Sequence, residues 1–445
     1  MDADRFFQLR ARGTDLRTEL IGGATTFAAL AYIIVVQPAV LATTGMDPGA
    51  VLTATCLASA FATVLMGLWA NYPIAVAPAM GHNFYFALVV AGPVASGGLG
   101  HSWRVALGAN CIAGAVFLGL SLVGLRERLL DAIPESLKHA IAAGIGLLIA
   151  LVGFEWGGVV RAAPGTLVAL GELRHPATLV SIGGTLLTAV LLVRRNRGAI
   201  LVGTLATAVA GVGLGLVAYQ GVIASPPGLA PTFGELDVRS ALRPDLVSVV
   251  FVFLFLGLFD TVGTLVGVAG QAGFLQAGRL PHARQAMATD ALGTVVGTVL
   301  GTSTVTAYVE SAAGVAAGAR TGLANLVTAG LLLAALFFSP LARMAGASVQ
   351  VGSAVLHPVV APALVVVGSF MIRGVTRVDL TDPPTAIASF LTMVTMPFAF
   401  SITEGIAFGF IAYALLMLAA GRGREVHPLL YVFAGLFVLR YAFLT

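Results

Sequence analysis

The chain has 445 residues, of which 58% are apolar and only 10% are charged. Its mean hydropathy of +0.97 lies far outside the range of soluble globular proteins, so the composition predicts an integral membrane protein. The formal net charge of +4 does not indicate a nucleic-acid partner. The basic residues lie in short loops between apolar stretches, where they set membrane orientation.

Apolar stretches long enough to cross a hydrocarbon core of about 30 Å recur along the whole chain. In chain order they cover approximately 19–43, 49–70, 101–124, 135–156, 177–193, 199–219, 246–270, 285–301, 321–339, 357–372, 385–401 and 404–420. Two more segments, near 72–94 and 302–318, are apolar but interrupted, and they raise the expected number of spans to about fourteen. The last apolar stretch, Pro428 to Leu444, contains Arg440 and is either a further span or an interfacial helix.

The positive-inside rule supports this arrangement, because basic residues gather in alternate loops. If the N-terminus lies inside, that side collects, among others, Arg10, Arg12, Arg17, Lys138, Arg194, Arg195, Arg320, Arg373, Arg377, Arg422 and Arg424. The other side holds Arg104, Arg161, Arg174, Arg239, Arg243 and Arg343. The pattern predicts a multi-pass membrane protein with a cytoplasmic N-terminus.

The two interrupted segments place polar groups in the middle of the membrane at matching points of two halves. They run from Ala77 to Phe86 and from Thr302 to Ala312. Polar side chains and irregular backbone are tolerated at this depth only where protein or a water-filled cavity receives them, so the pair predicts a binding site. Because seven spans is an odd number, the second half would insert upside down and form a 7+7 inverted repeat.

Asp260 is the first candidate for chemistry, because it lies near the middle of an expected span. A carboxylate at this depth costs several kcal/mol unless it is protonated or finds partners, so its side chain should face the interior of the bundle. Desolvation favours the protonated form and makes proton loading possible. The alternative is a structural acid that accepts hydrogen bonds from a neighbouring helix.

Glu310 follows the run Thr302 to Thr306, whose β-branched residues favour an extended conformation. We expect this run to lead into a helix that starts near Ala307, with Glu310 in its first turn. The N–H groups and positive dipole end of such a half-helix would keep the carboxylate ionised and attract electron-rich ligand atoms. The alternative is that Glu310 and Ser311 only cap the helix.

In the first half, Pro78 and Gly81 interrupt the helix start in the equivalent way. Asn83 offers a donor and an acceptor to the edge of a heterocycle, and Phe84 is one of three aromatic residues that could stack on a flat ring. Only one helical face can meet a cavity, and we favour Asn83 over His82. His82 is equally consistent with a structural donor and with a role in proton movement.

Gln37 directly precedes Pro38 and either lines the site or bonds a backbone carbonyl freed by the proline. Asp290 lies nearer to a span start and is expected to pack structurally. The sequence shows no nucleophile with a base at plausible spacing, no phosphate-binding Gly-rich loop and no metal-binding pattern. We therefore expect a secondary transporter rather than an enzyme, with no cofactor, no metal and no nucleic-acid partner.

At these residues the chain resembles the nucleobase:cation symporters of the xanthine/uracil permease superfamily, and within it the azaguanine-permease-like branch that carries purines. The matching segments are Gly22 to Phe27, Ala31 to Val36, Ala77 to Asn83, Asp260 to Thr264, Thr302 to Thr306, Tyr308 with Glu310 to Val315, and Gly318 to Leu323. Two positions depart from the branch. Gln37 stands where Asn is common before the proline, and His82 stands where many members have Leu.

The resemblance implies an all-α polytopic fold of core and gate domains, with short antiparallel β-strands in broken spans 3 and 10. The core would comprise residues 1–124 (spans 1–4) and 246–340 (spans 8–11). The gate would comprise residues 125–222 (spans 5–7) and 355–445 (spans 12–14 with the C-terminal apolar segment). The base would lie between the two domains, and a homodimer would form through the gate.

The resemblance also implies that Asp260 and Glu310 face a purine base, with Asn83 nearby, and that transport is coupled to protons. The expected substrate-binding residues are Glu310, Asp260, Asn83, Phe84, Tyr308, Thr26 and Gln37, and the proton-coupling candidates are Asp260 and His82. Guanine and hypoxanthine are favoured over adenine as substrates. The alternative is an anion transporter or channel of the same fold, which the acidic pair disfavours.

Overall fold

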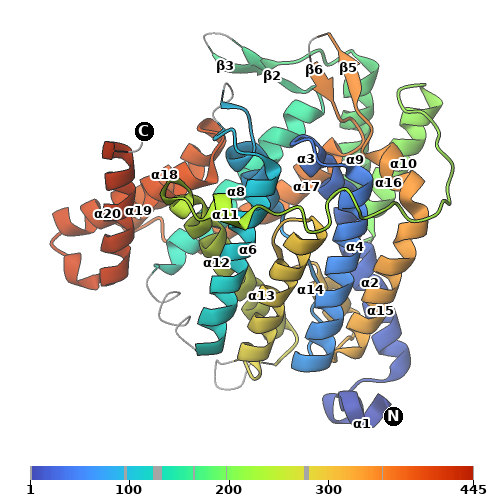
Figure 1. Ribbon diagram of the computed structural model, residues 1–445, viewed down its shortest axis with the longest axis horizontal. Helices are drawn as coiled ribbons and strands as arrows, with labels where there is room; N and C mark the ends of the chain where they lie inside the picture. Colours follow the sequence, from blue (N-terminus) through green and yellow to red (C-terminus); the bar gives the residue numbers. More distant parts are fainter. Residues whose placement is uncertain are drawn as a thin grey trace.

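The computed structural model describes residues 3–94, 98–123, 133–163, 166–196, 198–274, 280–352 and 354–443, and this part of the chain is mostly helical (Figure 1). Eight helical segments within it are long and apolar enough to cross a membrane. They are Leu16–Ala42, Pro48–Ala70, Trp103–Leu122, Glu135–Trp156, Pro176–Val193, Val247–Ala269, Leu323–Ala345 and Ile402–Ala419. The multi-pass helical architecture is thereby confirmed, while the larger number of about fourteen spans stays a prediction.

The helices and strands divide between the two halves of the chain. The first half contains α1 (Ala3–Phe7), α2 (Leu16–Leu30), α3 (Ile33–Ala42), α4 (Pro48–Leu65), β1 (Val76–Pro78), α5 (Met80–Phe84), α6 (Trp103–Val123), α8 (Glu135–Trp156), β2 (Val160–Ala163), β3 (Leu167–Leu170), α9 (Pro176–Val193) and α10 (Ala199–Gly213). The second half contains α11 (Val238–Ala241), α12 (Val247–Gln271), α13 (Ala283–Leu300), β4 (Val305–Ala307), α14 (Ser311–Ala316), α15 (Leu323–Ala335), α16 (Ser339–Ala345), β5 (Val349–Val351), β6 (Ala354–Leu356), α17 (Ala361–Met371), α18 (Pro383–Phe398), α19 (Ile402–Ala419) and α20 (Pro428–Phe443). Short 3-10 or π-helical turns continue four of these helices: η2 (Met66–Ala70), η3 (Tyr85–Val90), η6 (Leu336–Phe338) and η7 (Ile372–Arg377).

The first expected span is divided into α2 and α3 by a break at Ala31 and Tyr32. Pro38 lies inside α3, and a proline removes one helical hydrogen bond and crowds the carbonyl of the preceding turn. The break matters because it turns the side chain of Tyr32 toward the second half of the chain.

The two interrupted segments meet as a two-stranded antiparallel sheet, as expected from the short strands in both halves. The register pairs Val76 with Ala307, Ala77 with Thr306, and Pro78 with Val305. A further backbone hydrogen bond runs from Ala79 N to Thr304 O at 3.0 Å. The strand β4 ends where the sequence predicted a helix start, so that expectation is corrected: Ala307 is held in the sheet by Val76, and α14 begins at Ser311.

The outer edges of this small sheet are closed by side chains in equivalent ways. Thr63 of α4 donates to Val76 O at 3.1 Å and accepts from Val76 N at 3.0 Å. Thr294 of α13 donates to Val305 O at 2.9 Å and accepts from Val305 N at 3.3 Å. Inside a membrane every backbone polar group needs an internal partner. The two threonines supply these partners, which allows a sheet with two free edges to lie among helices.

The helices pack in two groups around the sheet. In one group, α15 packs on α2 and α4, α13 packs on α4 and α6, and α12 packs on α6. In the other, α8 packs on α17 and α18, α9 packs on α10 and α17, and α18 packs on α19. Buried apolar side chains from both groups form one large cluster. The predicted domain boundary between residues 124 and 125 falls within 124–132, outside the described residues.

The structure adds elements that the hydropathy pattern did not predict. Strands β2 and β3 form one hairpin and β5 and β6 form another, and both lie at the end of the molecule opposite α1 (Figure 1). The C-terminal stretch that the sequence left open forms the helix α20, which packs on α19.

A buried carboxylate ties α2 to the start of α15. Glu19 is fully buried and accepts hydrogen bonds from the backbone N–H groups of Arg320 at 2.7 Å and of Thr321 and Ala324 at 3.3 Å. A negative charge at the N-terminus of a helix is favoured by the helix dipole and by the unpaired N–H groups. Glu19 therefore fixes the position of the chain that follows α14.

We expect Glu19→Ala to destabilise the protein by about 2–4 kcal/mol, because three buried N–H groups lose a charged acceptor. Thermal denaturation in detergent, followed by tryptophan fluorescence, should show a clearly lower Tm. The control is Glu425→Ala, which removes an exposed carboxylate paired with Arg422 and should leave Tm unchanged. Equal Tm values for both variants would contradict the structural role of Glu19.

Candidate functional site

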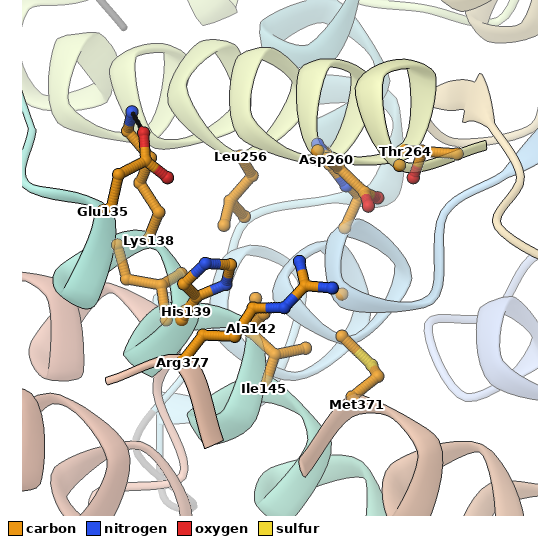
Figure 2. Close-up of a pocket in the computed structure, with 15 residues that line it drawn as sticks. Glu135, Lys138, His139, Ala142, Ile145, Leu256, Asp260, Thr264, Met371 and Arg377 are labelled. Atoms are coloured by element: carbon orange, nitrogen blue, oxygen red, sulfur yellow. Dashed lines mark hydrogen bonds and ion pairs between the residues drawn. The ribbon is translucent and has the colours of Figure 1, made fainter. Parts of the chain in front are cut away.

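A cavity of about 470 Å³ lies between the two helix groups, within the usual size range of small-molecule sites. Figure 2 shows α12 on one side, with Leu256, Asp260 and Thr264 pointing into the cavity. Residues of α8 and of the η7 turn, among them His139 and Arg377, lie on the other side. The short helix α5 contributes its first turn. The cavity therefore lies where the two groups face each other and where the first broken segment ends.

Asp260 exposes its side chain to the cavity. Within the described part of the chain its carboxylate has no hydrogen bond or ion pair. Successive helical residues point about 100° apart, so the next residue, Thr261, points away from the cavity. Thr261 donates to Asp290 at 2.6 Å and lies 2.9 Å from the hydroxyl of Thr306 in β4. Asp260 is thus free to contact a ligand, while its neighbour belongs to the scaffold.

Asp290 has the structural role that the sequence predicts. It is fully buried, and its two carboxylate oxygens accept hydrogen bonds from Ala307 N and Thr261 Oγ1, both at 2.6 Å. These bonds join α13, β4 and α12. The two mid-membrane aspartates therefore differ: one stabilises the broken segment, and the other faces the cavity.

Glu310 directly precedes α14 and is half-buried. It lies at the cap position rather than in the first helical turn, and its side chain makes no capping hydrogen bond. Its carboxylate accepts a hydrogen bond of 2.6 Å from the hydroxyl of Tyr32. Glu310 is not among the residues that line the cavity, but it lies near enough to Asp260 for the two charges to interact. The structure therefore brings the two acids into one electrostatic neighbourhood, since α12 packs on α14.

Gln37 and Asn83 lie away from the cavity, around the extended residues that precede β4. Gln37 donates to the hydroxyls of Thr302 and Ser303, both at 3.0 Å, and the Ser303 hydroxyl donates to Asn83. Both amide side chains are fully buried. Their contacts hold the broken segment in its extended conformation. Gln37 and Asn83 therefore influence the site through the backbone that they hold.

Phe84, Tyr308 and Thr26 are buried around the same segments. The hydroxyl of Tyr308 donates to Pro78 O at 2.7 Å and so links β4 to β1. Thr26 packs on α14 at Gly314, where any side chain would collide with the Thr26 hydroxyl. None of the three lines the cavity described above.

His82, in contrast, lines the cavity together with Gly81. The imidazole ring hydrogen-bonds to the backbone of Phe253 in α12, and its Nε2 atom has no partner among the described residues. The ring is 2% exposed. Of the two neighbours compared from the sequence, His82 therefore borders the cavity and Asn83 does not, because the first turn of α5 presents only one face to it.

The sequence did not single out two features of this region. Tyr32 was part of an apolar run, and only the break between α2 and α3 places its hydroxyl on Glu310. The charged residues that line the cavity on one side are Glu135, Lys138, His139 and Arg377; the sequence assigned Lys138 and Arg377 to membrane orientation alone and did not consider the other two. Lys138 and Glu135 form an ion pair of 2.7 Å there, on the side opposite Asp260 (Figure 2).

Solved structures define the class of protein to which this fold belongs. The transmembrane domain of the cyanobacterial bicarbonate transporter BicA matches with a TM-score of 0.62 at 16% identity, over 86% of this chain and 97% of that one. The overall structure of SLC26A9 matches with a TM-score of 0.60 at 11% identity, over 91% of this chain and 66% of that one. The chain thus has the fold of these polytopic membrane transport domains.

Sequence comparison then gives the family. Residues 17–408 match the profile of the xanthine/uracil permeases, described as "Permease family", and the chain belongs to this family. It is a transporter and not an enzyme. The guanine/hypoxanthine permease PbuG of Bacillus subtilis is 45% identical, over 99% of both chains. The adenine permease AdeP of Escherichia coli is 40% identical, over 99% of this chain and 96% of its own length.

Cysteine labelling tests the cavity without reference to any substrate. Gly263 and Gly267 line the cavity and have open space where a side chain would begin, whereas Leu265 on the same helix is 1% exposed. In a background with Cys56 and Cys111 replaced by serine, Gly263→Cys and Gly267→Cys should react rapidly with a water-soluble maleimide in permeabilised membranes. Leu265→Cys should stay unlabelled, and equal labelling of all three would contradict this cavity.

Proposed function

We propose that the protein imports purine nucleobases, with guanine and hypoxanthine preferred and adenine possible, by proton symport. The observation that carries this proposal is the carboxylate of Asp260, which has no partner among the described residues and lies in a cavity between two helix groups, close to a second acid, Glu310. The names of the relatives support the class of substrate: a guanine/hypoxanthine permease and an adenine permease are similar over almost the whole chain.

The two acids suit a purine because its edge presents N–H groups to acceptors. In our proposal Glu310 and Asp260 both contact the base, and Asp260 also carries the proton. Gln37, Asn83, Phe84, Tyr308 and Thr26 then act by shaping the broken segments around the base, and His82 is the second candidate for the proton. These roles are proposals, supported by the contacts described above.

The transport step in this proposal is an elevator-like movement of the core against the gate. The core corresponds to the group that contains α2 to α6 and α12 to α15, and the gate to the group that contains α8 to α10 and α17 to α20. The packing of the helices into these two groups supports the division into core and gate. The matching roles of Thr63 and Thr294 fit an inverted repeat of seven spans per half. The homodimer, the inner-membrane location and the cytoplasmic N-terminus rest on the family resemblance and on the basic loops.

An anion transporter of the same fold is the weaker alternative. Its support is the structural likeness to a bicarbonate transporter domain, which at 16% identity concerns the fold alone. Asp260, exposed to the cavity with Glu310 nearby, disfavours an anion on that side, although Lys138 and Arg377 line the other side. Uptake of radiolabelled guanine, hypoxanthine, adenine, sulfate and bicarbonate into proteoliposomes with an imposed pH gradient separates the two functions: accumulation of sulfate or bicarbonate but of no base would overturn the proposal.

The substitution Glu310→Gln should weaken guanine binding by about 2–4 kcal/mol, because a buried charged hydrogen bond is removed. Equilibrium binding to the purified protein measures this change. The exposed Glu172 supplies a matched control, since Glu172→Gln makes the same chemical change far from the acidic pair. Unchanged guanine affinity in Glu310→Gln would exclude Glu310 from the site.

The substitution Asp260→Asn should separate exchange from accumulation. Asparagine imitates the protonated carboxyl permanently, so exchange of base for base can continue while a pH gradient no longer drives uptake. Both processes are measured in the same vesicles, which makes exchange the internal control for folding. If Asp260→Asn still concentrates base against its gradient, the proton is carried by another residue, and His82 is tested next.

A further inference from the structure

Tyr32 occupies the break between α2 and α3 and is 2% exposed. Its hydroxyl donates a hydrogen bond of 2.6 Å to Oε1 of Glu310, although 278 positions of the chain separate the two residues. This distance lies in the range of an O–H donor bound to an ionised oxygen. Such a bond is roughly twice as strong as one between neutral groups, so the contact favours the ionised carboxylate.

Within the described part of the chain, Tyr32 is the side chain that donates to Glu310. The neighbouring Tyr308, whose ring centre lies 6.4 Å from that of Tyr32, uses its hydroxyl on Pro78 O at 2.7 Å. A hydrogen bond to Oε1 restricts the orientation of the carboxylate, so Oε2 remains as an acceptor that points in a defined direction. Tyr32 thereby controls both the charge and the orientation of Glu310.

The nature of the acceptor decides which base fits. Guanine and hypoxanthine present a ring N–H where adenine presents an unprotonated ring nitrogen, so an ionised Glu310 can accept from the first two but meets a second acceptor in adenine. A site whose buried groups match one hydrogen-bonding pattern strongly rejects the analogue that lacks it.

We propose that Tyr32 is a positioning residue that holds Glu310 as an oriented hydrogen-bond acceptor and so makes the site select oxopurines over adenine. This inference rests on the proposed function, in which Glu310 contacts the base. It assigns the selectivity to a residue that does not itself touch the base.

Tyr32→Phe removes one oxygen atom and tests the inference directly. The affinity for guanine and hypoxanthine should fall about tenfold or more, whereas the affinity for adenine should change far less. The ratio of guanine affinity to adenine affinity should therefore also fall by about tenfold. Equilibrium binding of all three bases to purified protein measures the change. Tyr431→Phe is the matched control, because it removes a hydroxyl that donates to Gly423 O at 3.0 Å in the C-terminal region.

The pH profile separates positioning from packing. Among the described residues, the titratable groups near Glu310 are Tyr32, Tyr308 and Asp260, and only Tyr32 is changed in the variant. Without this donor Glu310 is protonated more readily, so guanine binding should disappear at a higher pH than in the unmodified protein as the pH is lowered. Raising the pH should restore part of the binding, which a folding defect would not do. Tyr32→His, which keeps a ring donor, should retain more of the preference than Tyr32→Phe.

An unchanged ratio of guanine to adenine affinity in Tyr32→Phe, with an unchanged pH profile, overturns the inference. An equal, pH-independent loss of all three bases overturns it as well and assigns Tyr32 a packing role. If the unmodified protein binds none of the bases, the proposed function fails instead. Base binding by the unmodified protein therefore distinguishes failure of the proposed function from failure of the inference about Tyr32.

Discussion

The structure depends on one constraint: inside a membrane, every backbone N–H and C=O group needs a partner within the protein. The pair β1 and β4 breaks two helices and would leave both outer edges of a small sheet unsatisfied. Thr63 and Thr294 each serve as donor and acceptor to one strand residue. Asp290 binds the last N–H of β4. The broken segments exist because these side chains replace the missing helical bonds.

The scaffold also determines the electrostatics of the site. Thr261 hydrogen-bonds to Asp290 and directly follows Asp260 in the chain. A single turn of α12 therefore directs Asp260 into the cavity and Thr261 into the scaffold. Glu310 follows β4 directly and therefore shares the fixed position of the sheet. A small displacement of β4 would change the distance between the two acids, which links the stability of the scaffold to the chemistry of the cavity.

The polar cluster around Thr302 and Ser303 gives the fold a second rigid point. Gln37 from α3 and Asn83 from α5 reach the same residues from opposite sides. Buried amides of this kind cost free energy unless they are bonded, and once bonded they specify one arrangement. They join elements of the first half to the broken segment of the second half. Side chains that look like ligands in the sequence can therefore act by holding the backbone that carries the ligands.

The sequence by itself determined the features that depend on composition and local pattern. Mean hydropathy required a membrane protein, the interruptions at Pro78 and at Thr302 to Thr306 located the two broken segments, and isolated acids in apolar stretches identified Asp260, Glu310 and Asp290. Each of these conclusions follows from the cost of a polar group in an apolar environment, which can be judged from neighbours along the chain.

Only the tertiary structure decided which polar group meets which. Pairing with Val76 keeps Ala307 in a strand and moves the helix start to Ser311, and the rotation of α5 brings His82 rather than Asn83 to the cavity. The contact between Tyr32 and Glu310 crosses 278 positions, and it depends on a break in one helix and on the register of a sheet formed by two others. A sequence pattern records the local preference of each segment, but these contacts arise from the packing of segments that are distant in the chain.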